Sequence, residues 1–178
     1  MFYKDPVVSE DAISANPALF GKTAMEIYDE TVGALAKAGV MVILNNHISD
    51  AMWCCSPFDR NGIWHNDNYS DEQWVNAVTS MSGRYKDTPM VVGNDLRNEV
   101  RFDFWNFKVP EWSWADFDVD WHWAATRAGN SILSVAPNQL IIVEAINSGF
   151  RLQPIKTKTV VLDQPNKLVW SFHYYAFR

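Results

Sequence analysis

The chain has 178 residues, which is enough for one globular domain with a sizeable core and short for two. Apolar residues make up 48% and charged residues 20% of the sequence, which is the composition of a folded protein and excludes a disordered chain. The formal net charge is −6, and lysine and arginine form no cluster, so we expect no nucleic-acid partner.

The N-terminal residues lack the long apolar core of a signal peptide. No later apolar run approaches the ~20 residues that are needed to cross a bilayer. We therefore expect neither a signal peptide nor a membrane span in this chain.

The two cysteines, Cys54 and Cys55, are neighbours in the sequence. Neighbouring Cα atoms lie ~3.8 Å apart across a trans peptide, which is closer than an unstrained disulfide usually allows. Two interpretations stay open: two reduced or buried thiols, or one cysteine that pairs with a cysteine outside this chain.

Aromatic residues are abundant, with nine Trp, ten Phe and six Tyr, and many of them fall between Phe102 and Trp123. Large rings with a polar edge suit a hydrophobic core, a protein interface or stacking on sugar rings. Composition does not choose among these uses, so the position of each ring must decide.

Four apolar runs of strand length follow one another along the chain, and helical patterns separate them. The motif SDEQ at 70–73 has the form of a capped helix start, and the segment 147–166 shows no clear helix. In chain order, the sequence predicts a helix over 23–38, a strand over 40–44, a helix over 70–86, a strand over 90–93, a helix over 119–135 and strands over 140–143 and 167–172.

This alternation of strands and helices predicts an α/β fold with a parallel sheet, either doubly wound or a TIM (β/α)8 barrel. Polar residues directly follow each predicted strand, and a TIM barrel collects its catalytic groups at those strand ends. No Gly-rich turn marks a dinucleotide or phosphate site, so we expect no cofactor. A complete barrel takes ~250 residues, so we predict a partial TIM barrel, roughly strands three to six of eight.

The pair Asn98-Glu99, at the end of the second predicted strand, is the first candidate site. Cleavage of a glycosidic bond requires an acid that protonates the leaving oxygen, and a neighbouring amide can hydrogen-bond the 2-hydroxyl of the sugar. An isolated Asn-Glu pair also fits a charged residue that simply ends a strand. The surrounding segments distinguish the two interpretations.

Those segments resemble glycoside hydrolase family 5, the cellulase family of (β/α)8 barrels, and especially its plant and fungal cellulase-like members. The resemblance covers almost the whole chain and is specific because its motifs occur in the family's order. They are GVMVILNNH at 39–47, WCC at 53–55, NGIW at 61–64, VVGNDLRNEVR at 91–101, DWHWAATRAGN at 120–130 and HYY at 173–175.

The resemblance implies a retaining, two-glutamate hydrolase of O-glycosidic bonds in a β-linked glycan or glycoconjugate. Glu99 would be the general acid/base, Asn98 would contact the sugar, and His47 would be the active-site histidine of its strand. His173 and Tyr175 match the family's His-x-Tyr pair, which orients the two glutamates. Residues 1–178 would then form a single, incomplete catalytic domain with a carbohydrate substrate and an extracellular location.

Three features depart from the family pattern. Val100 follows Glu99 where the family commonly has proline, and Asn45 stands where aspartate is frequent, which removes a charge near the site. The family's nucleophile ends a strand beyond the His-x-Tyr pair and has no counterpart in these residues. Glu144 ends the third predicted strand, where the family has no nucleophile, so we expect a structural or subsite role for it.

The loop over 102–114 contains Trp105, Trp112 and Trp114. These rings either stack on sugars at the cleft or pack the loop onto the barrel, and both interpretations stay open. We take Trp105 as a candidate substrate-binding residue and expect Trp121 and Trp123 to be core residues.

The four histidines, His47, His65, His122 and His173, show no zinc-type spacing, so we expect no metal site. His122 is expected on a polar helix face.

An alternative to an active enzyme is a catalytically incomplete chain that at most binds carbohydrate or a protein partner. A partial barrel leaves two edge strands unpaired, which predicts aggregation or edge-to-edge self-association.

Overall fold

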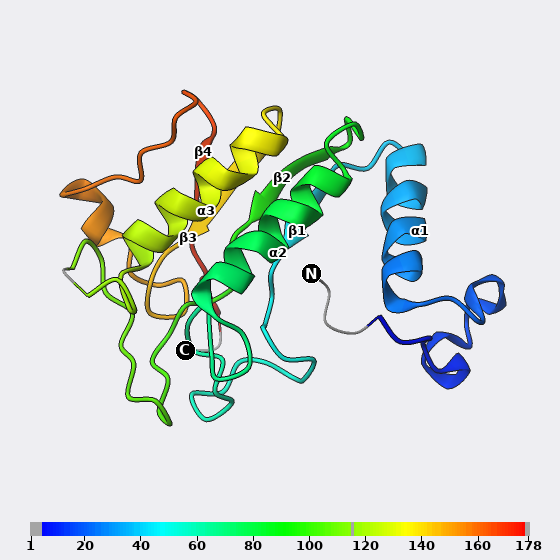
Figure 1. Ribbon diagram of the computed structural model, residues 1–178, viewed down its shortest axis with the longest axis horizontal. Coiled ribbons are helices and arrows are strands. Elements are labelled where there is room, and N and C mark those ends of the chain that lie inside the picture. The colour runs from blue at the N-terminus through cyan, green and yellow to red at the C-terminus, as the bar shows by residue number, and fades with distance from the viewer. Residues whose placement is uncertain (1–4, 115, 177–178) are drawn as a thin grey trace.

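The computed structural model describes residues 5–114 and 116–176 and has a parallel sheet with helices packed on one face (Figure 1). The strands of the described residues lie in sequence order, β1-β2-β3-β4, so each crossover adds the neighbouring strand. They are β1 (Val42–Asn45), β2 (Val91–Asp95), β3 (Leu140–Glu144) and β4 (Leu168–Ser171). The predicted α/β fold with parallel strands is confirmed.

Side-chain caps start the three α-helices. Thr23 and Ser70 form capping boxes with the residues three positions later, and Asp120 accepts the backbone N–H of Trp123 at 3.2 Å. The helices are α1 (Ala24–Lys37), α2 (Asp71–Arg84) and α3 (Trp121–Val135), and short 3-10 turns occupy Glu10–Ile13, Pro17–Leu19 and Gln153–Lys156. The bounds of the three helices predicted from the sequence agree with the structure to within two residues, whereas the three 3-10 turns were not predicted.

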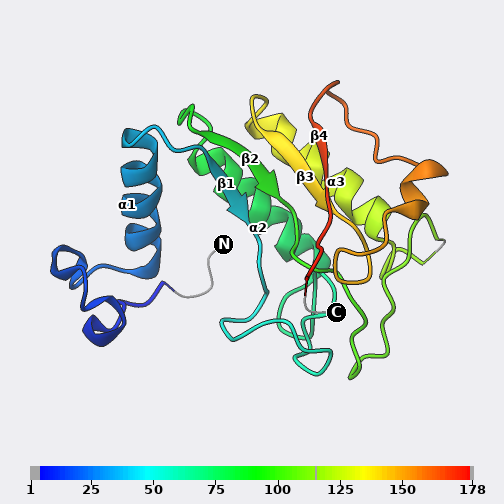
Figure 2. The same ribbon diagram turned by 180° about the vertical axis from the view of Figure 1, so that it is seen from behind.

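The core lies between the sheet and the helices α2 and α3, which run side by side (Figures 1 and 2). Its centre is a cluster of Trp64, Trp74 and Trp121, whose ring centroids are 5.3 to 6.1 Å apart. The indole N–H of Trp74 donates to the carbonyl of Leu96, and that of Trp121 donates to the carbonyl of Glu144. The aromatic core therefore anchors the carboxyl ends of β2 and β3. The prediction that Trp121 is a core residue is confirmed.

Among the described residues, no helix covers the opposite face of the sheet, and α1 stands beside β1 (Figure 2). On this open face Ile43 is 54% exposed, and Met41 and Phe172 beside the outer strands are 70% and 63% exposed. Within the described ranges, the outer edges of β1 and β4 pair with no further strand. None of the described helices has the length and apolar character to span a membrane.

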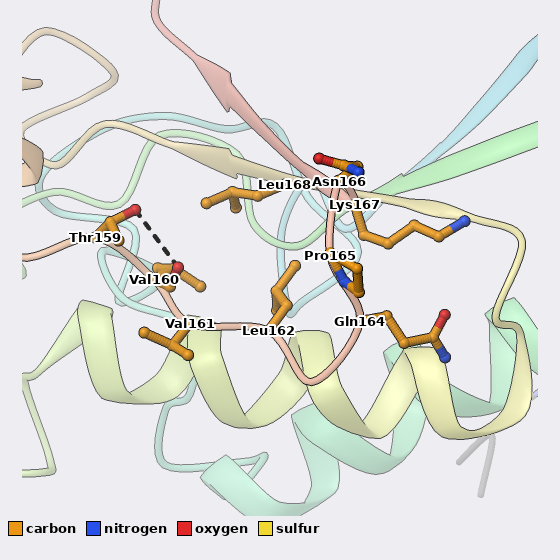
Figure 3. Close-up of a pocket in the computed structure, with 9 residues that line it drawn as sticks. All are labelled: Thr159, Val160, Val161, Leu162, Gln164, Pro165, Asn166, Lys167 and Leu168. Atoms are coloured by element: carbon orange, nitrogen blue, oxygen red, sulfur yellow. Dashed lines mark hydrogen bonds between the residues drawn. The ribbon is translucent and has the colours of Figure 1, made fainter.

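The segment 159–168 runs along α3 and lines a hollow of about 300 Å³ (Figure 3). Its lining contains no predicted site residue.

The segment 159–168 also shows that one expectation is wrong, since His122 is not on a polar helix face. His122 is 7% exposed, and its Nε2 lies 2.9 Å from the carbonyl oxygen of Thr159. The packing of this irregular segment, which has no sequence period, buries the side of α3 that appeared polar.

Candidate active site

The carboxyl ends of the four strands point to the end of the sheet where the long loops gather (Figure 2). Because parallel strands end on the same side, residues distant in sequence meet there. The polar residues at these ends are His47 after β1, Asn98 and Glu99 after β2, Glu144 in the last position of β3, and His173 and Tyr175 after β4.

The carboxyl group of Glu99 is the centre of this cluster. Its Oε1 lies 2.7 Å from Nδ1 of His173 and accepts a hydrogen bond from the Tyr175 hydroxyl at 2.6 Å. Burial raises the pKa of Glu99, but the hydrogen bonds from Tyr175 and His173 outweigh it, so the pKa lies below its ordinary value. Glu99 is therefore held as a carboxylate by both members of the predicted His-x-Tyr pair.

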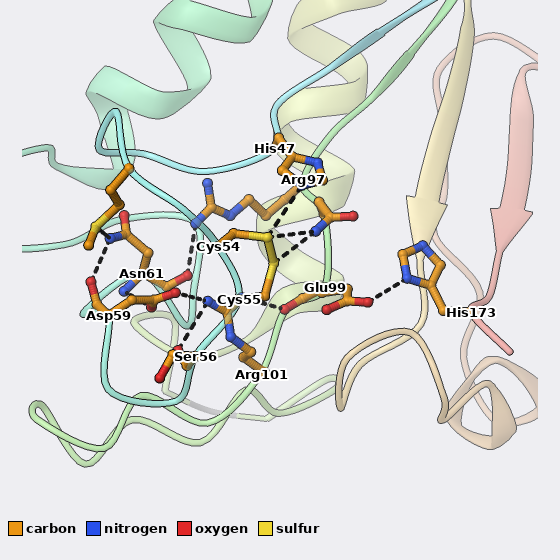
Figure 4. The surroundings of a disulfide bond; sticks show 12 residues. His47, Cys54, Cys55, Ser56, Asp59, Asn61, Arg97, Glu99, Arg101 and His173 are labelled. Carbon is orange, nitrogen blue, oxygen red and sulfur yellow. Dashed lines mark hydrogen bonds and ion pairs between the residues drawn. A yellow bond between two sulfur atoms is a disulfide. The ribbon is translucent and has the colours of Figure 1, made fainter. Parts of the chain in front are cut away.

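The imidazole of His173 lies between two carboxylates. Nδ1 faces Glu99 (Figure 4), and Nε2 lies 3.3 Å from Oε1 of Glu144. Burial lowers the pKa of His173, but the hydrogen bond to Glu99 and the charges of both glutamates together raise it above its ordinary value. An imidazolium with two N–H donors satisfies both carboxylates at once.

The backbone of Glu99 is also held in place. Its φ of +47° lies in the left-handed region, which is uncommon for a residue other than glycine and clusters at functional sites. Its N–H donates to Oε2 of Glu144 at 2.8 Å, and its carbonyl accepts from Nη1 of Arg101 at 3.1 Å. Contacts to β3 and to Arg101 therefore fix the backbone that carries the central carboxylate.

Glu144 faces these site residues rather than solvent. It is 1% exposed, and its two oxygens are directed at the Glu99 N–H and at His173. Such a group supports its neighbours and has little surface with which to meet a substrate.

His47 and Asn98 lie beside the two cysteines rather than beside the Glu99 carboxylate. Nε2 of His47 is 3.3 Å from Sγ of Cys54 (Figure 4). Nδ2 of Asn98 is 3.5 Å from Sγ of Cys55. Nδ1 of His47 faces Oδ1 of Asn45 at 3.2 Å. Asn98 is 5% exposed, so the sulfur atoms cover much of its amide.

The two expectations for the cysteines, separate thiols or a partner outside the chain, are wrong in this structure. Cys54 and Cys55 form a disulfide with each other. Those expectations assumed the Cα spacing of a trans peptide, whereas the peptide bond between the two residues is cis and the Cα atoms are 3.2 Å apart.

The ligand atoms of His47, Cys54 and Cys55 lie within 4.8 Å of one another, which is the spacing of a metal site. Metals bind cysteine as the thiolate. Because the two sulfur atoms are joined to each other, this cluster as it stands offers His47 as its one conventional ligand.

Comparison with known families decides how this geometry is interpreted. The family model described as Cellulase (glycosyl hydrolase family 5) matches residues 5–178, which is nearly the whole chain. The chain belongs to glycosyl hydrolase family 5.

Several relatives of the chain are endoglucanases by name. The chain is 32% identical over 172 residues to an endoglucanase of Paenibacillus polymyxa, covering 90% of this chain and 40% of that protein. It is 33% identical over 162 residues to a glycosyl hydrolase 5 family protein of Chamaecyparis obtusa, covering 91% of this chain and 27% of that protein. The chain thus spans less than half the length of these curated relatives.

Solved family 5 structures match the fold closely. The catalytic domain of the major endoglucanase of Xanthomonas campestris superposes with a TM-score of 0.80 at 27% identity, covering 93% of this chain and 48% of that chain. A cellotetraose complex of an endocellulase from Pyrococcus horikoshii superposes with a TM-score of 0.74 at 26% identity, covering 88% and 46%. The predicted partial barrel of the cellulase family is confirmed.

Two buried arginines near Glu99 were not predicted as site residues from the sequence. Nη2 of Arg101 binds Oδ2 of Asp59 at 2.6 Å, and both side chains are under 10% exposed. Arg97 is fully buried and donates to the carbonyl of Asn61 at 2.9 Å, and burial with the nearby Arg101 charge lowers its pKa to about 9. These arginines hold the loop after β1 against the end of β2. Their place within the segment VVGNDLRNEVR was the available signal.

The tryptophans of the 102–114 loop divide between the two interpretations. The indole N–H of Trp112 donates to the carbonyl of Lys158 and its ring packs on Trp170, so Trp112 packs the loop onto the barrel. Trp105 is 52% exposed, its indole N–H donates to the carbonyl of Phe58, and the Arg60 guanidinium lies over its ring. The structure therefore brings three of the predicted site residues, Glu99, His173 and Tyr175, into direct contact. His47 and Asn98 lie together at the disulfide. Trp105 makes its contacts with a different part of the loops.

Proposed function

We propose that this chain supplies the acid/base part of a retaining family 5 active site that hydrolyses β-linked glucan, with Glu99 as the acid/base. The observation that supports this role is the binding of one Glu99 oxygen by both His173 and Tyr175 at a strand end. Both hydrogen bonds fall on Oε1, so Oε2 is the oxygen that exchanges a proton with the glycosidic oxygen and then with water.

The role of Glu99 as an acid needs a second carboxylate nearby. With the described neighbours alone, the pKa of Glu99 is lowered, which suits a base rather than an acid. A nucleophile carboxylate ~5–5.5 Å away would raise that pKa by repulsion between like charges and return Glu99 to its acid role.

We propose that this nucleophile comes from sequence outside the 178 residues. Two facts support this assignment. Glu144 is 1% exposed and faces its neighbours, and the chain covers 48% of the Xanthomonas catalytic domain. Asp95, the other acidic side chain at these strand ends, is 8% exposed and accepts a hydrogen bond from Asn45.

The substrate we propose is a cellooligosaccharide or a longer β-glucan chain. The relatives named endoglucanase and the cellotetraose complex of a solved family 5 structure support this class. Asn98 and His47 would contact the sugar, and Trp105 would contact a more distant unit of the chain. We also propose an extracellular location, which is supported by a relative named major extracellular endoglucanase from Xanthomonas campestris.

Carbohydrate binding without hydrolysis is the second candidate function, and the burial of Glu144 favours it for this chain alone. The test is hydrolysis of an aryl β-glycoside panel by the purified chain, together with cellotetraose binding. We expect binding that Asn98→Ala weakens, and no turnover from the folded chain. Turnover that Glu99→Gln and Glu144→Gln both abolish would overturn the proposal of an external nucleophile.

The unpaired outer edges of β1 and β4 lead us to propose self-association of the chain. Exposed strand edges present free N–H and C=O groups that pair with another strand, and the open face adds exposed apolar side chains.

A further inference from the structure

Two buried carboxyl groups lie behind the Glu99 cluster, at the ends of β2 and β3. Asp95 is 8% exposed and Glu144 is 1% exposed. Asp95 pairs with Ile142 of β3, two positions before Glu144, so the two side chains leave the sheet on the same side, and the charge of Glu144 raises the pKa of Asp95. A carboxylate has only acceptors, so a hydrogen bond between two carboxyl groups requires a proton on one of them. Two adjacent buried charges of the same sign also repel each other strongly in a low-dielectric interior. The pair therefore holds one proton.

The donors around the pair show which group is charged. Glu144 receives the N–H of Glu99 on Oε2 at 2.8 Å, and its Oε1 lies 3.3 Å from Nε2 of His173 as an ion pair, so a donor and a cation face its two oxygens. Asp95 receives the amide of Asn45 on Oδ2 at 2.9 Å, but its buried Oδ1 accepts no hydrogen bond from a described residue. A proton on Oδ1 would make this atom a donor, and Glu144 is the acceptor group on the neighbouring strand.

We propose that Asp95 carries a proton that it donates to Glu144, and that the singly charged pair fixes His173 as an imidazolium directed at Glu99. This inference rests on the proposed function for its catalytic meaning, because it assigns Asp95 and Glu144 as positioning residues for the acid/base. Neither of them touches the substrate in this role.

Burial and the neighbouring Glu144 raise the pKa of Asp95 to about 8, which agrees with a protonated group at neutral pH. Three side chains face Asp95 from the elements around it. They are Asn45 from β1, Glu144 from β3 and His173 after β4. The Asn45 amide and the His173 charge oppose part of the rise in pKa.

The arrangement gives Glu99 a fixed partner while its own charge changes during a reaction cycle. If His173 lost its proton or turned away, the charge of Glu144 would lose the donor on Oε1, which is costly for a buried group. The charge of Glu144 therefore favours the imidazolium form of His173 also when Glu99 gains a proton and its own charge is lost.

Asn45 also acquires a physical role in this arrangement. Asn45 and Asp95 are cross-strand partners in the β1–β2 pairing, with Nδ2 of Asn45 donating to Asp95. An aspartate at position 45 would place another acidic group against the carboxyl pair, whereas the amide supplies a hydrogen bond without charge.

The test is a pH titration of the full chain labelled with ¹⁵N-histidine, followed by NMR. The resonance of His173 is identified by its loss in His173→Gln. We expect Asp95→Asn to leave the His173 midpoint above its ordinary value, because the new amide donates in place of the proton and Glu144 keeps its charge. Glu144→Gln is expected to lower that midpoint by about one pH unit or more. If Asp95→Asn lowers the midpoint as much as Glu144→Gln does, the charge lies on Asp95 and the proposal is overturned.

A second readout does not depend on whether Glu144→Gln folds. In the folded wild-type chain at neutral pH, we expect the infrared C=O stretch of a protonated carboxylic acid. This band should disappear as the pH rises past about 8, the pKa of Asp95, and it should be absent in Asp95→Asn. A folded wild-type chain without this band contradicts the proposal. Both measurements are made without sugar, so they test the protonation of Asp95 even if the chain has no hydrolytic activity. If they contradict the proposal for Asp95, the role of Glu99 is still tested separately by turnover and cellotetraose binding.

Discussion

Nδ1 of His173 lies 2.7 Å from Oε1 of Glu99, and this contact joins the residue after β4 to the end of β2. The two residues are 74 positions apart in the sequence, and the parallel sheet brings them together by ending both strands on the same side. A partly buried ion pair of this kind makes both stability and site geometry depend on the charge of each member.

The contribution of this pair to stability depends on pH in two directions. The pKa of Glu99 is lowered from 4.5, so its contribution is present above that pH and is lost as the pH falls through the folded-state pKa. The pKa of His173 is raised from 6.5, so its contribution is complete below that pH and is lost as the pH rises through the folded-state pKa. We expect the difference in Tm between wild type and His173→Gln to be largest between pH 4.5 and 6.5, measured by circular dichroism. A difference that is constant with pH would contradict the ion pair.

Gly149 is predicted to be essential for the position of His173. Its φ is +80°, and an added Cβ would lie 2.9 Å from Cγ of the His173 ring. Gly39 has nearly the same backbone, with φ of +75°, but open space around it. Gly39→Ala should cost about 1–2 kcal/mol, the cost of a left-handed alanine. Gly149→Ala should cost more, measured by urea denaturation, and should also shift the His173 NMR signals. Equal costs and unchanged His173 signals would argue against a tight contact.

The buried ion pair of Asp59 and Arg101 is predicted to matter for stability. Arg101 also donates to the carbonyl of Glu99, so the pair supports the site. Asp59→Asn leaves a buried guanidinium without its partner and should cost about 3–5 kcal/mol of unfolding free energy. The exposed pair of Arg60 and Asp67 is the matched control, and Asp67→Asn should cost at most about 1 kcal/mol. Similar costs for the two variants in chemical denaturation would contradict this account.

Self-association is predicted from the open sheet. We expect light scattering after size exclusion to detect dimers or larger species of the purified chain. Ile43→Lys, on the open face, should reduce their fraction, because a charged side chain disfavours apolar contact there. Val161→Lys, on the exposed 159–168 segment, serves as a control of similar exposure and should leave the fraction unchanged. A monodisperse wild-type monomer that melts cooperatively would contradict the prediction.

Much of the fold could be predicted because it depends on local patterns. Continuous apolar runs such as 140–143 indicate buried parallel strands, and the motif at 70–73 gives the capped start of α2. The grouping of Glu99 with His173 followed from one rule, namely that parallel strands end on the same side.

The remaining features depend on contacts that no local pattern specifies. The placement of Asp95 and Glu144 on the same side of the sheet depends on the register of β2 against β3, and an apolar run does not fix that register. The disulfide of Cys54 and Cys55 lies in the irregular segment between β1 and α2, which has no sequence period. The burial of His122 depends on how an irregular segment packs, and the position of Trp105 depends on a long loop.

The most direct test of Glu99 as the acid/base uses a hybrid barrel. Residues 5–178 would replace the corresponding part of the Xanthomonas catalytic domain, which this chain matches with a TM-score of 0.80. We predict that the hybrid hydrolyses an aryl β-cellobioside, and that Glu99→Gln lowers turnover by about 10²–10⁴-fold. Azide should restore part of that loss, because it attacks the glycosyl-enzyme without a general base. A folded Glu99→Gln hybrid that hydrolyses the glycoside as fast as its parent would contradict the assignment.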